Sequence, residues 1–521
     1  MLNKLFFVLL LTSVSFAQHI PMDFQFETKI KLNKSASGST TQTGNSITDL
    51  ITIGDTILLG SGKGLSISFD KGESWLNFYN HPKFGKEAIS GLGYKNGLIW
   101  AATAHSIEKD GQTLPEGSGF LFSLDAGNSW YKVPQPIDHK DSNKVYYGLN
   151  KLNALPITTA VNNITYDVAV TKDAVWIASF AGGLRKSTNK GGTWERVVIP
   201  PDNLNSIKPT DTLSFDLSPV SGSLGYQNNL NHRVFSVYAE TDSIIWVGTA
   251  GGINKSTDGG ISWRKFTKQN QTNGISGNFV VAINGTKVGG ATHIYAATWK
   301  AEDLTEEYAV SFTSDGGETW LQSNRTQRFH NFGFYNHISY AAGSEGLYRT
   351  DNSGVNWIKA PAIVDSITKQ RIQTNTFYSA ASQGNTIWIG SNSGLAKTTE
   401  TGSPWGGFWR VYLAYVPVNS ANETYSYPNP FNPDQEVVKI KYMTEGADKN
   451  VTIRIYDFGF NLLKTIIQNA PRSGTIDKLI QQTETWNGKD EFDSIVSNGV
   501  YFYSVEIGES KPAFGKIMVL R

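Results

Sequence analysis

Short apolar segments that end in small residues recur along most of the chain. They occupy residues 57–60, 99–102, 175–178, 245–248, 294–297, 339–342 and 387–390. Each follows a segment of alternating polarity, such as 164–170 or 234–238, and a further short apolar segment, such as 197–199, comes later in each repeat. Alternation with a period of two is typical of β-strands that bury one face. Each repeat is therefore predicted to form four antiparallel strands.

A polar eight-residue repeat, Ser/Thr-x-Asp-x-Gly-x-Ser/Thr-Trp, follows each apolar segment. Its seven copies are residues 68–75, 123–130, 187–194, 256–263, 313–320, 350–357 and 398–405. Asn replaces Asp at positions 189 and 352, and the last copy has Glu400 and Pro404. An aspartate can accept hydrogen bonds from turn N–H groups, while glycine adopts the left-handed conformation. We expect each copy, called a box below, to form the turn between the third and fourth strands, with its Trp packed between neighbouring sheets.

Four-stranded units in radial repetition form β-propellers. The boxes, together with the segment Ile-Trp-x-Gly-Thr-x-x-Gly-Ile at 245–253, resemble the Asp-box (bacterial neuraminidase repeat) propellers. The resemblance implies an all-β fold, with a seven-bladed β-propeller over residues 45–416. It does not specify an activity, because the same boxes occur in sialidases, xyloglucan-cleaving glycosidases, sortilin-type receptors and photosystem assembly factors.

Both ends of the chain differ from the repeats. Lys4, the apolar run 5–11 and the small residues Ser15 and Ala17 predict a signal peptide over 1–17, followed by an N-terminal segment over 18–44. No other stretch approaches the ~20 apolar residues of a membrane helix, so no transmembrane segment is expected. A polar linker over 417–424 precedes residues 425–521, where alternation at 437–442, 451–456 and 500–505 predicts a small Ig-like β-sandwich.

Residues 425–521 also resemble a family. The segments 428–433 (Pro-Asn-Pro-Phe-Asn-Pro), 456–459, 486–490, 499–503 and 515–521 are similar to the C-terminal sorting domain of type IX secretion cargo. That family is akin to the Ig-like domain of flagellar hook-capping proteins. Asn487 and Asp493 depart from its usual pattern. The resemblance implies type IX secretion machinery as a partner, and a secreted or outer-membrane cell-surface location reached through the periplasm.

Charge and composition exclude several classes of function. Lysine and arginine number 46 against 45 acidic residues, and no basic block is present, so we expect no nucleic-acid partner. The chain has no cysteine, which excludes disulfides and thiolate metal sites. Its eight histidines are scattered without ligand spacing, and no phosphate-binding glycine loop leads into a helix. The sequence therefore predicts neither a metal nor a cofactor.

Length variation points to a ligand-binding face. From each box Trp to the second residue of the next apolar segment there are 25, 46, 52, 32, 20 and 31 residues, so the loops between repeats vary most. Variable loops on a rigid scaffold commonly bind ligands. Tyr146, Tyr147 and Tyr226 fall in the longest loops and Tyr166 on a first strand, where their rings would suit sugar stacking.

Catalysis is the alternative hypothesis. A typical sialidase needs an arginine ahead of the first box, and residues 18–67 contain none. Asp49 and Asp167 fall on first strands near the expected channel and are the candidates for the carboxylate pair of a glycoside hydrolase. The leading hypothesis is a non-catalytic surface or secreted protein that binds a polysaccharide or a surface protein. The alternative is a glycoside hydrolase with carboxylates at the channel mouth.

Overall fold

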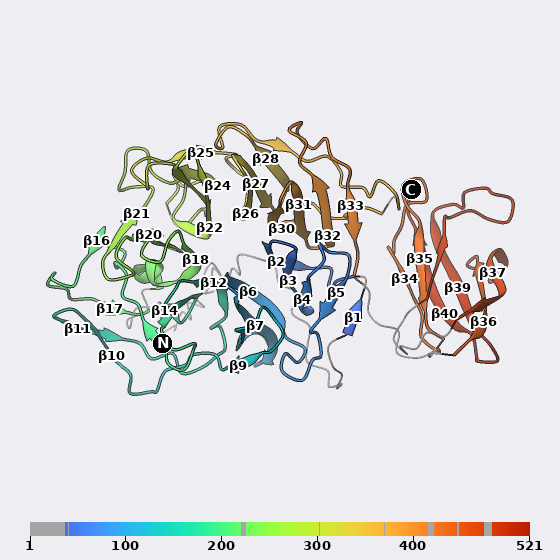
Figure 1. Ribbon diagram of the computed structural model, residues 1–521, viewed down its shortest axis with the longest axis horizontal. Coiled ribbons are helices and arrows are strands. Elements are labelled where there is room, and N and C mark those ends of the chain that lie inside the picture. Colours follow the sequence, from blue (N-terminus) through green and yellow to red (C-terminus); the bar gives the residue numbers. More distant parts are fainter. Residues whose placement is uncertain are drawn as a thin grey trace, which may run out of the picture. The chain divides into compact units, whose positions relative to one another are not determined.

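The structure is a computed structural model that describes residues 37–39, 41–219, 226–301, 303–368, 370–414, 421–444, 447–473 and 482–521. The predicted signal peptide over 1–17 and most of the segment over 18–44 lie outside these ranges. The described chain is all-β except for one short 3₁₀ helix, η2 (Tyr226–His232) (Figure 1). None of the described helical segments is long and apolar enough to cross a lipid bilayer.

The repeats form successive antiparallel sheets with four core strands each, which is a propeller-like arrangement (Figure 1). The first three sheets contain β2 (Ile47–Ile53), β3 (Thr56–Ser61), β4 (Gly64–Ser68) and β5 (Trp75–Asn77); β6 (Ala88–Lys95), β7 (Leu98–Lys109), β8 (Gln112–Ser123) and β9 (Tyr131–Val133); and β12 (Thr165–Val170), β13 (Val175–Ser179), β14 (Gly183–Ser187) and β15 (Glu195–Arg196). A short strand, β1 (Ser37–Ser39), pairs with β5 at the edge of the first sheet.

The remaining sheets of the repeat region have the same strand order. They contain β18 (Val234–Ala239), β19 (Ile245–Thr249), β20 (Gly252–Ser256) and β21 (Trp263–Phe266); β22 (Phe279–Val288), β23 (Ala291–Trp299), β24 (Ala309–Thr313) and β25 (Leu321–Ser323); β26 (Phe329–Tyr335), β27 (Ile338–Gly343), β28 (Gly346–Thr350) and β29 (Ile358–Lys359); and β30 (Phe377–Gln383), β31 (Thr386–Ser391), β32 (Gly394–Thr399) and β33 (Arg410–Tyr412). The prediction of four antiparallel strands per repeat is confirmed.

The small residues that end the apolar segments allow neighbouring sheets to approach closely. A Cβ atom at Gly248 on β19 would lie 2.8 Å from a methyl group of Val280 on β22, and one at Gly390 would lie 2.7 Å from Ile47. Second strands such as β13 and β19 are buried along their whole length. The apolar runs in the sequence therefore correspond to strands covered on both faces, as is usual for strands inside a layered core.

The chain divides into two compact units, one containing residues 93–285 and 289–331, the other containing 30–92 and 332–521. Within the second unit, the start of the repeat region contacts its end. Gln42 Nε2 donates to the carbonyl of Tyr412 at 2.9 Å. The backbone carbonyl of Asn45 accepts the N–H of Gly394 at 2.8 Å, and its side-chain Oδ1 accepts the N–H of Ala414 at 2.5 Å. Ile47, Leu50 and Trp75 share a hydrophobic cluster with Trp388 and Leu395.

Residues after the linker form two sheets around one core. Strands β34 (Tyr425–Tyr427), β35 (Val438–Tyr442) and β38 (Gln482–Trp486) form the first sheet; β37 (Leu462–Arg472), β36 (Lys449–Tyr456), β39 (Gly499–Ile507) and β40 (Ala513–Val519) form the second. Apolar side chains of both sheets share one cluster, which includes Ile440 and Ile453. The strands expected at 437–442, 451–456 and 500–505 correspond to β35, β36 and part of β39.

The proline-rich motif at 428–433 holds the end of β40. The buried Phe431 donates its N–H to the carbonyl of Met518 at 3.0 Å and accepts the N–H of Leu520 at 3.0 Å. Asn429 accepts the N–H of Met518 at 2.8 Å. The motif and the terminal strand, which the sequence shows as separate segments, are therefore parts of one structural element.

Candidate functional site

The boxes are closed hydrogen-bonded turns. In the fourth copy, Ser256 Oγ donates to Asp258 Oδ1 at 2.8 Å and accepts the N–H of Gly260 at 2.8 Å. The N–H of Ser262 donates to Asp258 Oδ1 at 2.9 Å, and its hydroxyl donates to Oδ2. The same pattern is present around Asp70, Asp125, Asn189, Asp315 and Asn352. Each carboxylate is occupied within its own turn, so the boxes are structural devices.

The box Trp side chains pack against the preceding sheet. Their ring centroids lie 6.0 Å apart for Trp194 and Trp100, and 6.2 Å apart for Trp320 and Trp246, both in edge-to-face geometry. The Lys255 ammonium lies 4.6 Å from the centroid of Trp246 and donates to the carbonyl of Gly316 in the next box at 2.8 Å. A cation over an aromatic face is an attractive contact. The lysine thus ties one sheet to the next box.

The last box uses a different connection. Where three other sheets have Lys (186, 255 and 397), β28 has Arg349, whose guanidinium contacts the Glu400 carboxylate at 2.8 and 3.2 Å. The Tyr340 hydroxyl also donates to Glu400. Burial acts against ionisation, but the hydrogen bonds from Arg349 and Tyr340 keep the pKa of Glu400 below its usual value. The Glu in this box therefore compensates the buried arginine of the preceding sheet.

The two candidate catalytic carboxylates are bound to backbone amides. Asp49 lies just after a β-bulge in β2 and accepts the N–H groups of Leu50 (2.8 Å) and Leu92 (3.0 Å). Asp167 holds the equivalent position in β12 and accepts the N–H groups of Val168 (2.8 Å) and Val237 (2.9 Å). Each side chain thus links the first strands of two successive sheets.

Burial raises the pKa of Asp49 to about 6, although the two backbone hydrogen bonds lower it. A raised pKa is one property of a general acid. Both carboxyl oxygens of Asp49 are nevertheless engaged by backbone N–H groups, as are both oxygens of Asp167.

The candidate ligand-binding tyrosines have separate environments. Tyr146 is 72% exposed, and the Lys151 ammonium lies 5.6 Å from its ring centroid. Tyr147 is only 8% exposed, and its hydroxyl donates to the carbonyl of Ile261 at 2.7 Å. The expectation that Tyr147 offers an open stacking surface is therefore wrong, because its ring belongs to the core. Tyr226 begins η2, but its side chain lies outside the described residues.

Tyr166 belongs to a row of aromatic rings, three of them on first strands and the fourth, Trp299, at the end of β23. It is the bulged residue of β12, and its ring centroid lies 5.3 Å from that of Phe235. Phe235 lies 4.7 Å from Phe279, which lies 6.0 Å from Trp299. Phe235 and Phe279 are buried and Tyr166 is half-buried, so the row stabilises the packing of successive sheets more than it offers an open platform.

The two longest loops fold together into a small sheet of their own. β10 (Lys144–Tyr147) and β11 (Asn150–Ala154) form a hairpin before the third sheet. β17 (Asp216–Leu217), from the loop after the third sheet, pairs with β11 in parallel. A further strand of that loop, β16 (Ser206–Ile207), extends the edge of the fourth sheet. The variable loops are thus ordered structure over much of their length.

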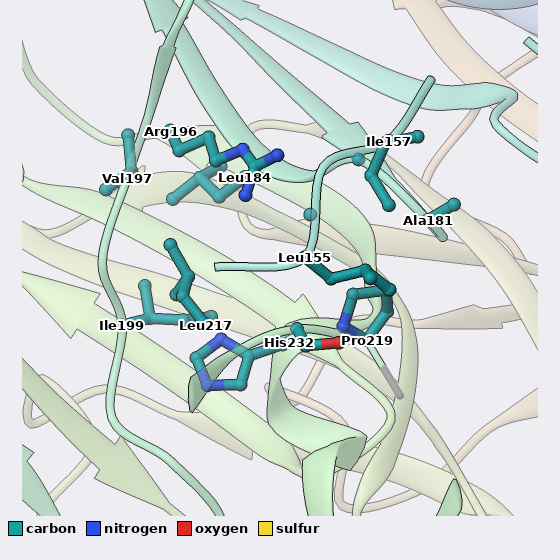
Figure 2. Close-up of a pocket in the computed structure, with 13 residues that line it drawn as sticks. Leu155, Ile157, Ala181, Leu184, Arg196, Val197, Ile199, Leu217, Pro219 and His232 are labelled. Atoms are coloured by element: carbon teal, nitrogen blue, oxygen red, sulfur yellow. The ribbon is translucent and has the colours of Figure 1, made fainter. Parts of the chain in front are cut away.

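A pocket lies where these two loops meet the turn between β13 and β14 (Figure 2). It is a small hollow that is partly open to solvent and has space for about one or two water molecules. Its walls are mainly apolar side chains, with three polar ones, and the lining residues are Leu155, Ile157, Ala181, Gly182, Gly183, Leu184, Arg196, Val197, Ile199, Leu217, Ser218, Pro219 and His232.

Positive charge exceeds negative charge beside the pocket. The Asp138 carboxylate receives both terminal nitrogens of Arg185 at 2.9 Å and is also contacted by Arg196. Burial alone would raise the pKa of Asp138, but hydrogen bonds from the two arginines lower it. Asp216, next to Leu217 in the sequence, is exposed and bonds Asn153 instead. Two guanidinium groups therefore share one carboxylate in this cluster.

His232 forms another wall of the pocket. It is 4% exposed, its ring stacks on Phe215 with centroids 6.0 Å apart, and its Nε2 has no hydrogen-bond partner among the described residues. Burial lowers the pKa of His232 to about 4, and the charge of Lys265 acts in the same direction. The imidazole is therefore neutral near pH 7 and keeps an unused hydrogen-bonding position.

The sequence pattern indicates the variable loops but does not single out Arg196 or His232. A partial signal is present, because residues 151–154 (Lys-Leu-Asn-Ala) alternate between polar and apolar side chains, as expected of a strand, and in the structure their burial alternates as well. Nothing in the sequence showed that β11 would pair with β17.

No family model matches the chain, and no curated protein matches it. Among solved structures, it is similar to YCF48 from Cyanidioschyzon merolae, with 12% identity and a TM-score of 0.41 over 71% of this chain and 100% of the other. It is similar to a GH74 enzyme of Niastella koreensis, with 13% identity and a TM-score of 0.46 over 94% and 75%. It is also similar to PorZ, a surface component of the type IX secretion system of Porphyromonas gingivalis, with 14% identity and a TM-score of 0.30 over 91% and 66%.

Proposed function

We propose that this chain is a non-catalytic binding protein, exported to the cell surface or the medium, that recognises a polysaccharide or a surface protein through its variable loops. In this proposal residues 1–17 are a signal peptide and 18–44 an N-terminal segment. Residues 45–416 form a seven-bladed Asp-box propeller, 417–424 a linker, and 425–521 an Ig-like sorting domain read by type IX secretion machinery.

The observation that carries the non-catalytic assignment is the engagement of Asp49 and Asp167. Both oxygens of each carboxylate accept backbone N–H groups that join successive strands. A carboxylate held in this way stabilises the fold and is not free to protonate a leaving group or activate a water molecule. The box carboxylates are similarly occupied. Hydrogen bonds from Ser129 and Ser123, for example, lower the pKa of Asp125 to about 2.

Export through residues 425–521 is supported by the motifs that resemble the sorting family and by how they meet. The 428–433 segment bonds the end of β40, so two of the motif segments form one surface element. In this proposal the two segments act together in recognition. It gives a translocon a folded element to recognise and does not depend on an unstructured tail.

A panel of polysaccharides tests the binding assignment against the glycosidase alternative. Each polysaccharide is assayed with the full chain for retention on an affinity gel and for release of reducing ends. Retention without release is expected. Release that disappears in Asp167→Asn or Asp49→Asn, but persists in the box variant Asp258→Asn, would overturn the proposal in favour of a glycoside hydrolase.

Deletion of residues 425–521 tests the export assignment. The truncated chain should accumulate in the periplasm of a host with type IX secretion, whereas the full chain should reach the surface or the medium. A periplasmic marker and cell-surface protease treatment distinguish the compartments. Arrival of the truncated chain in the medium would contradict the sorting role.

A further inference from the structure

We propose that the polysaccharide recognised by this chain is acidic, and that its carboxylates bind the exposed cations of Arg328 and Lys300 beside Tyr308. The three side chains lie where two loops meet. Residues 300–308 connect β23 to β24, and Arg328 is the last residue before β26. This inference rests on the proposed function, because it names the class of polysaccharide that the variable loops would recognise.

Arg328 is exposed, but aromatic side chains hold its guanidinium in place. The guanidinium carbon lies 4.8 Å from the ring centroid of Tyr308 and 5.6 Å from that of the buried Trp299. Arg328 Nη2 donates to the Tyr308 hydroxyl at 3.1 Å, and Trp299 is itself fixed by donating to the carbonyl of Phe329 at 2.9 Å. A cation over an aromatic face is an attractive contact, and a side chain that is already ordered loses less freedom on binding. Arg328 is therefore preorganised for a ligand.

Neither cation forms an ion pair with an acidic residue of the described ranges. Lys300 is exposed, and its ammonium lies 5.8 Å from the same Tyr308 ring centroid. By contrast, Arg325, three positions before Arg328, pairs with Glu307 at 3.4 Å. Two uncompensated positive charges thus share one aromatic ring. An anion can bind them without displacing an ion pair of the chain.

The acids of the same loop are engaged by other groups. Asp303 accepts the N–H of Thr305 at 2.7 Å and Nε2 of Gln269 at 3.2 Å. Glu306 is 2% exposed, and Asn278 donates to it from its backbone N–H at 3.1 Å and from its side-chain amide at 2.8 Å. These carboxylates stabilise the loop conformation and do not neutralise the two exposed cations.

The hydrogen-bonding groups of the site favour a polyuronate. Arg328 and Lys300 carry donors only, and the phenol hydrogen of Tyr308 has no acceptor among the described residues. A carboxylate accepts only, and a guanidinium matches its planar geometry. Every sugar of a polyuronate carries a carboxylate, so adjacent sugars can present an anion to each cation, and joined contacts strengthen one another. A protein surface instead presents isolated carboxylates among backbone N–H donors, which find no acceptor in these three side chains.

Calorimetric titration of the full chain provides the first test. The ligands are hexagalacturonate, hexamannuronate and the fully methyl-esterified hexagalacturonate, which has the same sugar without the charge. We expect a dissociation constant on the order of 100 µM for at least one of the two acids. The ester should bind at least about tenfold more weakly, because it lacks the charge-assisted hydrogen bonds. Affinity for the acid should also fall as NaCl rises from about 50 to about 500 mM, because salt screens exposed charges.

Variants separate this site from general attraction between charges. Arg328→Met removes the guanidinium and leaves an unbranched apolar side chain over the rings, so the fold should persist and affinity for the acid should fall at least about tenfold. Arg325→Met is the matched control, because it removes the same charge three residues away from an arginine that already has a partner. It should keep the affinity within about twofold. Melting curves of both variants check that the fold is retained.

The inference is overturned if neither acid binds, if the ester binds as tightly as the acid, or if Arg328→Met retains the affinity. Tighter binding of hexa-L-glutamate than of either sugar acid would overturn it in favour of an acidic protein ligand. Retention of a neutral polysaccharide that persists in Arg328→Met would overturn the acidic class and leave the proposed function intact. Failure of every polysaccharide to bind would contradict polysaccharide recognition itself.

Discussion

The Asp and Asn side chains of the boxes and the polar side chains at the pocket differ in how completely they are hydrogen-bonded. In the boxes, each Asp or Asn receives hydrogen bonds from residues two and four positions away, and the pattern recurs from sheet to sheet. At the pocket, one carboxylate serves two arginines, and His232 Nε2 has no partner among the described residues. A repeated turn whose Asp or Asn oxygen is satisfied indicates a role in stability. The His232 nitrogen does not by itself indicate a ligand, because the Nε1 atoms of the box residues Trp75, Trp194 and Trp320 are also buried without a partner among the described residues.

The largest effect is expected from breaking the connection in the last box. Glu400→Gln leaves the Arg349 guanidinium, which is 1% exposed, without its main counter-charge. Removing one partner of a buried ion pair destabilises by about 3–5 kcal/mol. The control is Glu73→Gln in the first box, where a 77%-exposed carboxylate lies 3.6 Å from Lys397 and should contribute less than about 1 kcal/mol. Urea denaturation measures both, and equal losses would show that Glu400 has no special role.

Substitutions at two adjacent glycines separate two requirements of the box turn. One is a left-handed backbone conformation, and the other is the close approach of the turn to the preceding sheet. Gly259 and Gly260 have φ values of +74° and +90°. A Cβ at Gly260 would lie 2.4 Å from the Trp176 ring, whereas one at Gly259 meets nothing within 4 Å. Gly260→Ala should lose about 3 kcal/mol, from backbone strain and overpacking, and Gly259→Ala about 1 kcal/mol, from strain alone. Similar melting temperatures for the two variants would show that the approach to Trp176 is unimportant.

The pocket histidine should make stability depend on pH. The folded-state pKa of His232 is about 4, below the value of about 6.5 in an unfolded chain, so the unfolded state binds the proton more readily. Stability is therefore lost as pH falls below about 6.5, by about 2 kcal/mol at pH 5 relative to pH 7. His232→Gln should remove this part of the dependence, which denaturation at the two pH values measures. An unchanged dependence in the variant would show that His232 is not buried as a neutral group.

The smallest effect is expected from Asp49. Its raised pKa makes the protein less stable as pH rises, whereas the lowered pKa of His232 makes it less stable as pH falls. Because its folded-state pKa is about 6, the stability it contributes is present at low pH and is lost as pH rises through 6. Asp49→Asn should therefore be less sensitive to pH between 5 and 8 by about 1 kcal/mol, a figure reduced for partial exposure. Thermal melts across this range test it. A variant as sensitive as the original chain would assign the effect to other groups.

The boxes were predictable because their chemistry is local and repeated. Asp258 and Ser262 are four residues apart, so the turn that joins them is encoded within eight positions. The substitution of Glu400 could be seen, but its partner Arg349 could not, because the two lie 51 residues apart. Likewise, the sequence correctly placed Asp49 and Asp167 on first strands. It could not predict their hydrogen bonds to the next sheet, because the donors are backbone N–H groups, which every residue except proline has.

The pocket was not predictable for a related reason. Leu155, Leu217 and His232 come from two loops that share no repeat, and they meet only because β11 and β17 pair in parallel. Tyr147 illustrates the same limit. Its position in a long loop suggested exposure, but the hairpin folds back so that its ring joins the core of the third and fourth sheets. Loop length therefore predicted where variation lies, and not which side chains face a ligand.

The bonds of Asn45 set an order for folding during synthesis. Its partner Ala414 lies 369 residues further along the chain, so the first sheet waits for most of the repeat region before this contact can form. Until then, Ile47, Leu50 and Trp75 lack Trp388 and Leu395, the apolar neighbours that cover them in the completed structure. Exposed apolar surface on an incomplete chain promotes aggregation. The earliest part of the repeat region to be synthesised is thus the part whose apolar side chains wait longest for their neighbours.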